Sequence, residues 1–476
     1  MTLDRISINK TIADVEQLLV QDATLSPALN AAIRMLIIAV QLLADKAKLD
    51  SRNSSKPPAT DPHRARKKMT PTGRKVGGQP AHTGSNLALI DKPDVIHILN
   101  IDKRRLPKGT YRDAGFEARQ VIDIHIERCV TEYRAQILQN EKGQCFVAEF
   151  PVEVTRPTQY GASAKANAVY LSMFQLIPYE RVQTQFAEQY GIALSTGSLS
   201  NFNQDAYQRL FDFEAIAKRK LLAEAIVHAD ETGINVNGKR IWLHSASSEH
   251  WSWFYPHAQR GHEAMDAIGI LPHFTGTLVH DHWKPYYRYG CTHALCNAHH
   301  LRELTYAEEI DGQQWAKALR ELLLEINSAI EKSKSPLSSK RRNGFVQRYR
   351  ALLHEADAEC PEPNKKAPHQ RGRVKRSKSR NLLLRLRDYE ADVLRFLADP
   401  RVPFTNNQGE RDIRMSKVQQ KISGCFRSME GAYTFCLIRS YLSTCRKQGV
   451  GAGEALDCLF KGVWPEFIRR ELEGGE

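Results

Sequence analysis

The sequence predicts an α/β protein whose sheet lies in the second half of the chain. Residues 225–230 (AIVHAD) and 276–281 (GTLVHD) are short apolar runs that each end in an aspartate. Between them, residues 240–247 and 250–257 are rich in aromatic and apolar side chains and are joined by a short turn. Short apolar runs bounded by turn residues are typical of buried strands, and their alternation with helical segments predicts a layered α/β core.

Helical patterns complete this core. Residues 260–274 predict a helix between the two aspartate-ending strands, and residues 292–297 predict another short strand. A helix follows directly and is expected to continue to about residue 332. Residues 333–400 are helical and basic, with a Pro-rich interruption. The chain then predicts two final helices, at residues 406–420 and 434–449.

The N-terminal region predicts a helix over residues 27–50. Pro27 after Ser26 suits a helix start. The apolar side chains follow the a/d spacing of a short coiled coil: Leu29, Ile33, Leu36, Val40, Leu43 and Ala47. Three heptads leave two interpretations equally open, a helix packed on its own domain and a dimer seam.

The middle of the first half divides into three segments. Residues 51–90 have the Pro, Gly, Ser and Lys/Arg content of a linker. Residues 91–160 alternate in short β-like runs and predict a small antiparallel β unit. Residues 161–222 are helical, and the spacing around Gly191 is compatible with a helix-turn-helix, although an ordinary structural helix pair is favoured. The predicted units are residues 1–50, 51–90, 91–160, 161–222, 223–304, 305–400 and 401–476.

The charge of the chain is concentrated in two segments. The formal net charge is +14 over 476 residues. Residues 51–82 hold eight Lys/Arg and one acid, and residues 364–387 hold ten Lys/Arg and no acid. Such segments favour a polyanionic partner. The competing interpretation is a solvated tether and a disordered loop that contact no polyanion.

Several classes of protein are disfavoured. The longest apolar run, residues 35–40 followed by 42–44, is shorter than the ~18 residues that a membrane span requires. The N-terminus has no apolar signal core, and nine scattered cysteines are typical of a reduced, cytosolic protein. A P-loop and a strand–GxGxxG–helix pattern are absent from the sequence, so nucleotide hydrolysis and dinucleotide chemistry lack support.

Three acids are the candidate catalytic residues. Asp230 and Asp281 end two predicted strands, and Glu410 falls in the first turn of a helix that Asn406 or Asn407 can cap. Oxygen ligands of this kind suit Mg²⁺, and two such ions can stabilise both oxygens of a phosphodiester exchange. Each acid alone is more often a capped turn or an ion pair, but their order along the predicted elements is specific.

The motifs around these acids carry a resemblance. They are DETGINVNGKRIWLH, RG at 260–261, VHDHWKPY, LCNAHHLREL, PFTNNQGERDIRMSKVQQKISGCFRS and IRSYLSTCRKQG. Together with the N-terminal helix and the NSSKPP and GGQPAHTG linker motifs, they resemble the transposases of the insertion sequence 66 family over nearly the whole chain. The resemblance implies a ribonuclease-H-like catalytic core with a DDE triad, interrupted by a helical insertion before the final Glu.

By motif, the triad falls on Asp230, Asp281 and Glu410. Glu231 should point to the opposite side of its strand and is not chosen. The implied reaction is cleavage of phosphodiester bonds at the element ends, followed by joining of the 3′-OH ends to target DNA, with two Mg²⁺ or Mn²⁺ ions held by the triad. The implied partners are double-stranded DNA, a second copy of the chain and two small companion proteins, without a membrane. The implied location is the bacterial cytoplasm, at the nucleoid.

Basic residues are candidates for DNA contacts. Lys417 and Arg414 lie on the same helix face as Glu410, and Arg260 opens a helix where backbone N–H groups can bind phosphate. An ordinary helix start and a solvated helix face are the competing interpretations. The two basic segments contribute further DNA-binding candidates: Lys375, Arg376, Arg373, Lys67 and Lys68.

The positions of cysteine and histidine residues indicate whether the chain has zinc sites. Cys296 and His299 have metal-ligand spacing, but a structural Zn²⁺ site needs four ligands, so packing and hydrogen bonding are favoured for this pair. Members of the family usually carry a Cys-x-x-Cys zinc ribbon in the small β unit. Here only Cys129 and Cys145 occur in residues 91–160, so we expect no zinc in that unit.

Two alternatives to an active transposase remain open from the sequence. One is a catalytically inactive, transposase-derived DNA-binding protein that acts as a repressor or architectural factor. The other is a ribonuclease-H-like nuclease that acts on RNA or junctions. The presence of all three acids favours a DNA enzyme, and the two basic segments favour long duplex DNA over RNA.

Overall fold

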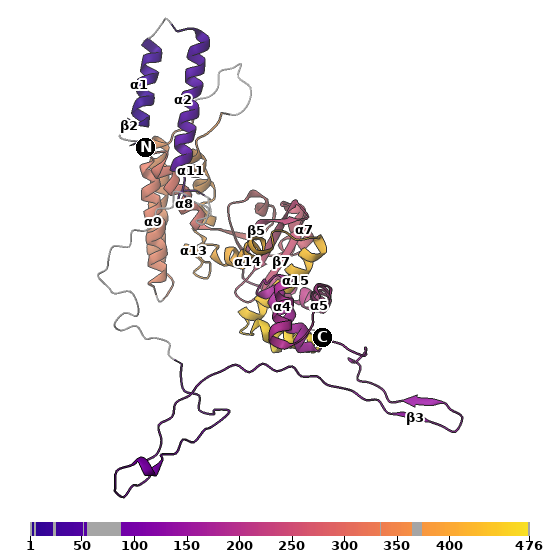
Figure 1. Cartoon of the computed structure of the whole chain (residues 1–476). Helices are drawn as coiled ribbons and strands as arrows, with labels where there is room; N and C mark the ends of the chain where they lie inside the picture. The colour runs from indigo at the N-terminus through magenta and orange to yellow at the C-terminus, as the bar shows by residue number, and fades with distance from the viewer. Residues whose placement is uncertain are drawn as a thin grey trace.

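The protein is known from a computed structural model. It describes residues 2–3, 6–21, 25–50, 52–54, 87–333, 335–363 and 374–474. A hairpin of two helices lies next to a helical region, which adjoins the body that contains the main sheet (Figure 1). Residues 87–160 run as an extended chain along one side of this body.

The main sheet is mixed and has five strands in the order β7-β6-β5-β8-β9. Neighbours β7, β6 and β5 are antiparallel, whereas β5, β8 and β9 are parallel. The strands are β5 (Ile226–Val236), β6 (Lys239–Ser247), β7 (Ser252–His257), β8 (Thr277–His280) and β9 (Thr292–Leu295). Every strand predicted in this half of the chain is therefore confirmed.

Strand β5 is longer than the sequence predicts because a tight hairpin joins it to β6. The turn residues Asn237 and Gly238 both have positive φ, 46° and 76°. This is the conformation that a two-residue hairpin turn requires, and Asn-Gly adopts it readily. The hairpin extends β5 six residues past Asp230, so the aspartate lies within the strand and not at its end.

Helices cover the sheet and complete its core. Helix α14 (Asn407–Ser423) packs on β5 and β6, and α15 (Met429–Lys447) packs on the edge strand β7. The backbone N–H of Phe254 in β7 donates to Ser440 Oγ at 2.8 Å. An edge strand exposes unpaired backbone groups, and this contact satisfies one of them. Helices α7 (His262–Ile268), α16 (Ala452–Phe460) and α17 (Glu466–Glu473) complete the body.

The helix pair around Gly191 belongs to the same core. Helix α4 (Tyr179–Tyr190) ends at Gly191 in the left-handed conformation, with φ 62°, and α5 (Thr196–Gln208) begins after Ser195, whose side chain accepts the N–H of Ser198. Phe186 of α4 is buried in the core, as predicted for a structural pair. The neighbouring helical elements are α3 (Ala162–Val169), a π-helical turn (Tyr170–Phe174) and α6 (Phe211–Ala223).

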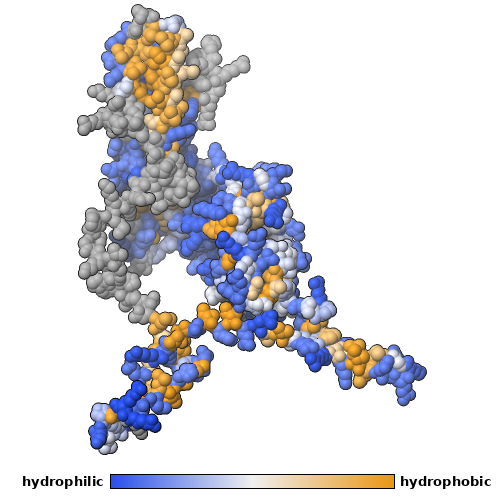
Figure 2. All heavy atoms as spheres, in the orientation of Figure 1, coloured by the Kyte–Doolittle hydropathy of each residue, from blue (hydrophilic) through white to orange (hydrophobic). Residues whose placement is uncertain are grey.

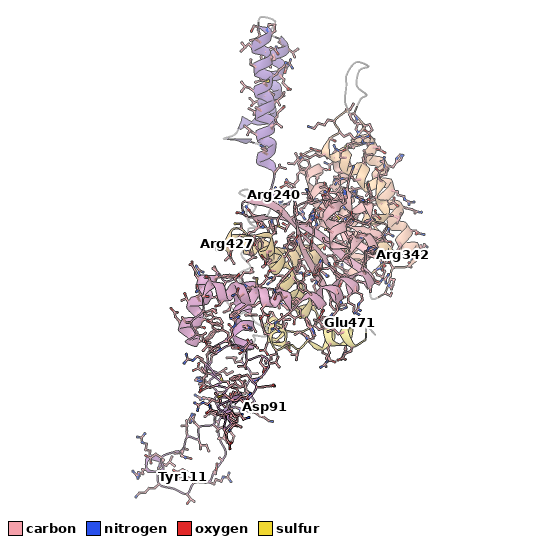
Figure 3. The ribbon with its side chains drawn as sticks, turned by 90° about the vertical axis from the view of Figure 1, so that its right-hand side faces the viewer. Asp91, Tyr111, Arg240, Arg342, Arg427 and Glu471 are labelled. Atoms are coloured by element: carbon pink, nitrogen blue, oxygen red, sulfur yellow. The ribbon has the colours of Figure 1, made fainter. Side chains whose placement is uncertain are left out.

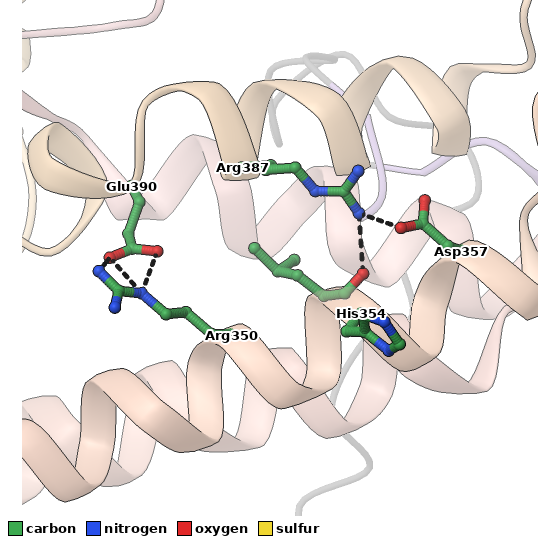
Figure 4. A pocket seen from close by; sticks show the side chains of 6 residues that line it. Arg350, His354, Asp357, Arg387 and Glu390 are labelled. Atoms are coloured by element: carbon green, nitrogen blue, oxygen red, sulfur yellow. Dashed lines mark hydrogen bonds and ion pairs between the residues drawn. The ribbon is translucent and has the colours of Figure 1, made fainter.

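The helical insertion forms a second core. Helix α8 (Asn297–Glu309) does not continue to residue 332 as expected, because Gly312 turns the chain with φ 70° and α9 (Gln314–Glu331) packs back on α8. The insertion also contains α10 (Ser339–Glu359), α11 (Lys378–Asp388), α12 (Glu390–Val393) and α13 (Arg395–Ala398). A cavity of ≈ 320 Å³ between α10 and α11 is bordered by the ion pairs Arg350–Glu390 and Arg387–Asp357 (Figure 4).

The prediction of a β unit over residues 91–160 is wrong for most of that segment. The structure makes strands of only β3 (Ile137–Gln139) and β4 (Cys145–Val147), which form one exposed hairpin. Large apolar side chains such as Phe116 and Val121 are 93% exposed. Figure 3 shows Tyr111 in this segment, well away from Arg240 of the main sheet. Isolated strands need a second packed layer for stability, and this segment has none within the described residues.

The N-terminal helices expose the predicted coiled-coil seam. Helix α1 (Ile8–Gln21) packs on α2 (Pro27–Lys48), whose residues Ile37 and Ala44 are buried, while Leu36 and Leu43 of the seam remain 64% and 65% exposed. Figure 2 shows the apolar side chains gathered on this hairpin. By length and composition, the stretch Pro27–Ala44 of α2 could also cross a membrane, with a mean hydropathy of 1.7. One such helix is weak support for a membrane, because a coiled-coil seam has the same composition.

Candidate active site

Strand pairing brings Asp230 and Asp281 together. Strands β5 and β8 pair in parallel from Ile226–Thr277 to His228–Val279. Continuing this register by two residues places Asp230 beside Asp281. The backbones of neighbouring strands lie about 4.8 Å apart. Both carboxylates are partly buried. The two strand-end aspartates of the sequence are thus neighbours in space.

Asn406 attaches the start of α14 to the same strand. Its Oδ1 lies 2.7 Å from His228 Nδ1, and its Nδ2 donates to the carbonyl of Ala229 at 2.9 Å. Asn406 is the N-cap residue of α14 by position, but its side chain makes no capping bond because β5 occupies it. Gly409 permits this approach, since a Cβ there would lie 3.0–3.3 Å from the Asn406 side chain. Glu410 follows in the first turn of α14.

The charges of the other candidate acids act on Asp230. Burial, followed by the charges of Glu231, Asp281 and Glu410, raises the pKa of Asp230 to about 8. Like charges at short range disfavour the ionised form, and a cation would relieve that repulsion. The oxygen-only donor set of Asp230, Asp281 and Glu410 suits a hard divalent ion such as Mg²⁺. The chemistry of this donor set therefore fits the expected metal, whereas the ligand atoms that lie within 4.8 Å of one another in the described residues are those of Cys296, His299 and Glu410.

Glu231 is bound on the other face of β5. His228 and Asp230 share the face that meets α14, so Glu231 points away from it. Its carboxylate accepts from Arg260 Nη2 at 2.6 Å and from the Tyr286 hydroxyl at 2.6 Å. Its side chain is only 2% exposed. These contacts support leaving Glu231 out of the triad.

Arg260 is consequently not a free cation at a helix start. Besides its ion pair with Glu231, its guanidinium lies 4.7 Å from the ring centre of Trp242 and 4.3 Å from that of Trp283. Such stacking is favourable for a guanidinium and fixes its position. Phosphate binding by Arg260 stays a prediction, and the observed contacts assign it a packing role at the rear of β5.

Glu410 also faces a cysteine and a histidine. Ligand atoms of Cys296, His299 and Glu410 all lie within 4.8 Å of one another. Cys296 directly precedes α8, and its Sγ accepts the backbone N–H of Asn406 at 3.1 Å. This bond links the start of α8 to the start of α14. The predicted packing and hydrogen-bonding role of Cys296 is therefore present in the structure, and Glu410 is a neighbour that spacing alone does not reveal.

A cleft of ≈ 260 Å³ opens beside Asp281. Arg302 projects into it from α8, and its Nη2 lies 3.9 Å from Glu410 Oε1. The N-terminal chain reaches the same cleft, where Asn53 Nδ2 donates to Glu309 Oε2 at 3.1 Å. The lining residues are Asn53, Ser54, Asp281, His282, Trp283, His299, His300, Arg302, Glu303 and Arg385. Of the three candidate catalytic acids, Asp281 thus borders an open, mixed-charge cleft.

The predicted phosphate-binding cations on α14 differ in their surroundings. Lys417 Nζ donates to the carbonyl of Gly233 at 2.8 Å, so this lysine is held on β5. Burial lowers the pKa of Lys417, as does the nearby Arg240. Arg414 is exposed, and no hydrogen bond or ion pair joins it to another described residue. Arg414 is the better placed of the two to meet a phosphate.

Acids of the insertion neutralise much of the basic segment 364–387. Arg376 pairs with Glu362 at 2.7 Å, and Arg380 pairs with Asp357 at 2.6 Å. The other ion pairs of the described part of the segment are Arg380–Glu362, Arg385–Glu303 and Arg387–Asp357. Lys375 is exposed, whereas Arg373, Lys67 and Lys68 lie outside the described residues. The sequence overstated the free charge here because the compensating acids are distant in the chain.

Comparison with known families identifies the protein. A model described as "Transposase IS66 family" matches residues 157–434, more than half of the chain. The chain belongs to the IS66 transposase family. A second model, a family of unknown function (DUF6444), matches residues 3–88. No curated protein matches the chain.

The match to the IS66 transposase family spans the sheet, the insertion and α14. Sequence reasoning missed two residues of this member's site. Asn406 appeared only as a helix cap, although its side chain joins α14 to β5. Arg302 lies within the quoted motif LCNAHHLREL but received no role, because its neighbour Glu410 is more than 100 residues away. Only the fold reveals such contacts.

Proposed function

We propose that the protein is a DNA transposase that cleaves the ends of an insertion sequence and joins the 3′-OH ends to target DNA. Family membership supports transposition in general. The observation that carries the specific proposal is the parallel pairing of β5 and β8, whose register places Asp230 beside Asp281. The raised pKa of Asp230, caused first by burial and then by Glu231, Asp281 and Glu410, agrees with it. A buried, mutually repelling set of carboxylates is unfavourable for folding alone, and such sets are common at catalytic sites.

The residues of the chain have distinct roles in this proposal. Asp230, Asp281 and Glu410 would hold two Mg²⁺ or Mn²⁺ ions, which when bound stabilise the attacking and leaving oxygens of the phosphodiester. Asn406 fixes the start of α14, and with it Glu410, against β5. Arg302 is positioned beside Glu410, where its charge can hold a phosphate of the DNA backbone. The chain itself supplies no covalent nucleophile.

The sheet topology supports a ribonuclease-H-like core. Three antiparallel strands are followed by two parallel ones, in the order β7-β6-β5-β8-β9, and the two aspartates belong to the adjacent strands β5 and β8. The insertion α9–α13 separates β9 and α8 from α14, which carries Glu410. This arrangement agrees with the core and interruption that the family resemblance implies.

Double-stranded DNA is the proposed partner, bound at the cleft and by exposed cations such as Arg414 and Lys375. The exposed apolar seam of α2 supports a homo-oligomer, because a second copy could cover it. Two DNA ends must be held together during transposition, and an oligomer provides two sites. Companion proteins of the same element and a nucleoid location remain part of the proposal through family resemblance alone.

The test is metal-dependent nicking of DNA that carries the ends of the element. The wild-type protein should nick in Mg²⁺ or Mn²⁺ and not in EDTA, and Asp230→Asn, Asp281→Asn and Glu410→Gln should each abolish nicking while retaining DNA binding. The matched control is Glu263→Gln, which removes an exposed acid of α7 and should leave nicking unchanged. Unchanged nicking in the three variants would refute the site. Specific DNA binding without any nicking by the wild type would favour the inactive DNA-binding alternative.

A further inference from the structure

We infer that Cys296, His299 and Glu410 form a binding site for one borderline transition-metal ion, such as Zn²⁺, beside the proposed magnesium site. Their ligand atoms all lie within 4.8 Å of one another. Thiolate, imidazole and carboxylate are the three ligand types that Zn²⁺ takes in proteins. The donor set differs in chemistry from the oxygen-only set of Asp230 and Asp281, because sulfur and nitrogen ligands select against Mg²⁺.

Burial raises the pKa of the Cys296 thiol, but several N–H groups near the sulfur could stabilise a metal-bound thiolate. Cys296 directly precedes the 13-residue helix α8, whose N-terminal N–H groups favour negative charge. The backbone N–H of Asn406 donates to the sulfur at 3.1 Å, and the N–H groups of Ala298 and His299 also favour its ionised form. Burial, the largest effect, raises the pKa of the free thiol. A metal ion would therefore displace the thiol proton on binding.

His299 provides an independent indication of a ligand. Its Nδ1 is buried, and no described residue forms a hydrogen bond with it. Buried polar atoms nearly always have a hydrogen-bond partner in folded proteins, so this unpaired nitrogen indicates a bound ligand. The same imidazole interacts with the charges of Asp281 and Glu410. The imidazole of His299 thus has a ring nitrogen with no partner among the described residues and belongs to the Cys296–His299–Glu410 cluster.

The fold explains why three ligands meet here. Cys296 and His299 are three residues apart and share a face at the start of α8, in the Cys-x-x-His spacing common in zinc sites. Glu410 comes from the first turn of α14, and the Asn406–Cys296 hydrogen bond joins the two helix starts. The sequence alone favours packing for the Cys/His pair because it offers only two ligands. The structure adds the third.

Three protein ligands leave one coordination position open to water, as in open zinc sites and unlike a closed structural site. Glu410 would serve both this ion and the proposed magnesium pair. If the proposed function holds, an ion bound to Cys296 and His299 would hold Glu410 on their side and would slow Mg²⁺-dependent nicking. The binding measurement below does not depend on DNA cleavage, so failure of either proposal can be recognised separately.

The test is an optical titration of the full-length, metal-free protein with Co²⁺ alone, in a reductant that does not bind metal. Co²⁺ replaces Zn²⁺ at such sites and reports thiolate coordination by a charge-transfer band in the near ultraviolet. We expect one equivalent to bind with this band, and Zn²⁺ to displace it because Zn²⁺ binds more tightly than Co²⁺. Glu410→Gln and His299→Ala should weaken binding at least about 100-fold, beyond the loss from an outer-sphere change.

Three variants make the result specific. Cys296→Ser keeps a hydrogen-bond acceptor for Asn406 and should remove the thiolate band. Cys425→Ser, which removes an exposed free thiol, should leave the band unchanged, as should Asp230→Asn in the proposed magnesium site. A far-ultraviolet circular dichroism spectrum verifies folding, and His299→Ala provides a second reading if Cys296→Ser does not fold. The inference is overturned if wild type shows no band, or if the band persists in Cys296→Ser or His299→Ala.

Discussion

The sheet and the helical insertion differ in whether their acidic side chains have cationic partners. At the sheet, Asp230 has no ion pair with a described cation, and burial followed by the charges of Glu231, Asp281 and Glu410 raises its pKa to about 8. In the insertion, acids and arginines pair, and a hydrogen bond from Arg380 lowers the pKa of Asp357. An unrelieved cluster costs stability, whereas a paired cluster does not.

This difference distinguishes charged residues with a proposed catalytic role from those with a structural role. Asp230 has no ion pair with a described cation, so a bound metal ion would relieve the repulsion that raises its pKa, and its arrangement suits a reaction. The arginines of the insertion already have partners in Asp357, Glu362 and Glu303, so most of their charge holds α8, α10 and α11 together. A basic segment in a sequence is therefore not by itself a DNA-binding surface.

We expect the largest effect from a variant that breaks the cluster of Asp230, Asp281 and Glu410. Asp281→Asn removes a ligand and should lower the rate of metal-dependent nicking by roughly 1000-fold, since metal stabilisation of the transition state contributes several kcal/mol. Arg380→Met, which breaks the paired cluster, should change the rate only a few-fold at a temperature where it is folded. The measurement is the initial nicking rate in Mg²⁺. Equal losses in the two variants would remove the contrast between the regions.

We expect a second, smaller effect from a variant that removes the contacts fixing the position of Glu410 but keeps all the acids. Asn406→Ala deletes the bonds to His228 and Ala229. We expect a loss of about 10–100-fold in apparent Mg²⁺ affinity, the usual range for residues that orient ligands. Saturating Mg²⁺ should restore part of the rate. A Mg²⁺ titration of nicking tests this, and an unchanged half-saturation concentration would show that Asn406 does not position Glu410.

Stability should respond with opposite sign in the two regions. Asp230 binds its proton more tightly in the folded than in the unfolded state, because burial and the charges of Glu231, Asp281 and Glu410 raise its pKa from 3.8 to about 8. Its contribution to stability is therefore present below pH 4 and is lost as the pH rises to 8. Asp230→Asn should raise the Tm of the metal-free protein at pH 8 by a few degrees and less at pH 5. Arg380→Met should lower Tm at both pH values.

Thermal melts in EDTA at the two pH values measure this difference. The loss in Arg380→Met corresponds to about 1–3 kcal/mol, the usual contribution of hydrogen bonds to a charged group. Added Mg²⁺ should stabilise the wild type at pH 8 and have little effect on Asp230→Asn. A lower Tm for Asp230→Asn at pH 8 would contradict an unrelieved acid cluster.

The smallest effect concerns DNA affinity. Each phosphate contact contributes about 0.9 to the slope of log affinity against log salt. Arg414→Ala should reduce that slope by about one unit, because Arg414 is exposed, whereas Arg387→Ala should leave it unchanged because Asp357 already neutralises Arg387. Filter-binding titrations at several salt concentrations provide the slopes. A reduced slope for Arg387→Ala would mean that the insertion exchanges its internal pairs for DNA.

Local sequence patterns predicted much of the fold because the relevant interactions are local. Apolar runs predicted β5 to β9, and the order of the motifs predicted Asp230, Asp281 and Glu410 as candidate catalytic residues. The same strand-like patterns failed over residues 91–160, since an apolar run becomes a strand only where another layer covers it. Contacts between distant segments, such as Asn406 with β5 and Glu410 with His299, could not be predicted from spacing.

The central claim is that three carboxylates from β5, the end of β8 and α14 share divalent cations. Crystals of the protein soaked in Mn²⁺ and measured at the manganese absorption edge would test it most directly. The account predicts anomalous density bridging Asp230 and Asp281, with Glu410 coordinating at about 2.1 Å. Manganese bound by Asp281 alone, with Glu410 turned away in every copy, would contradict the account.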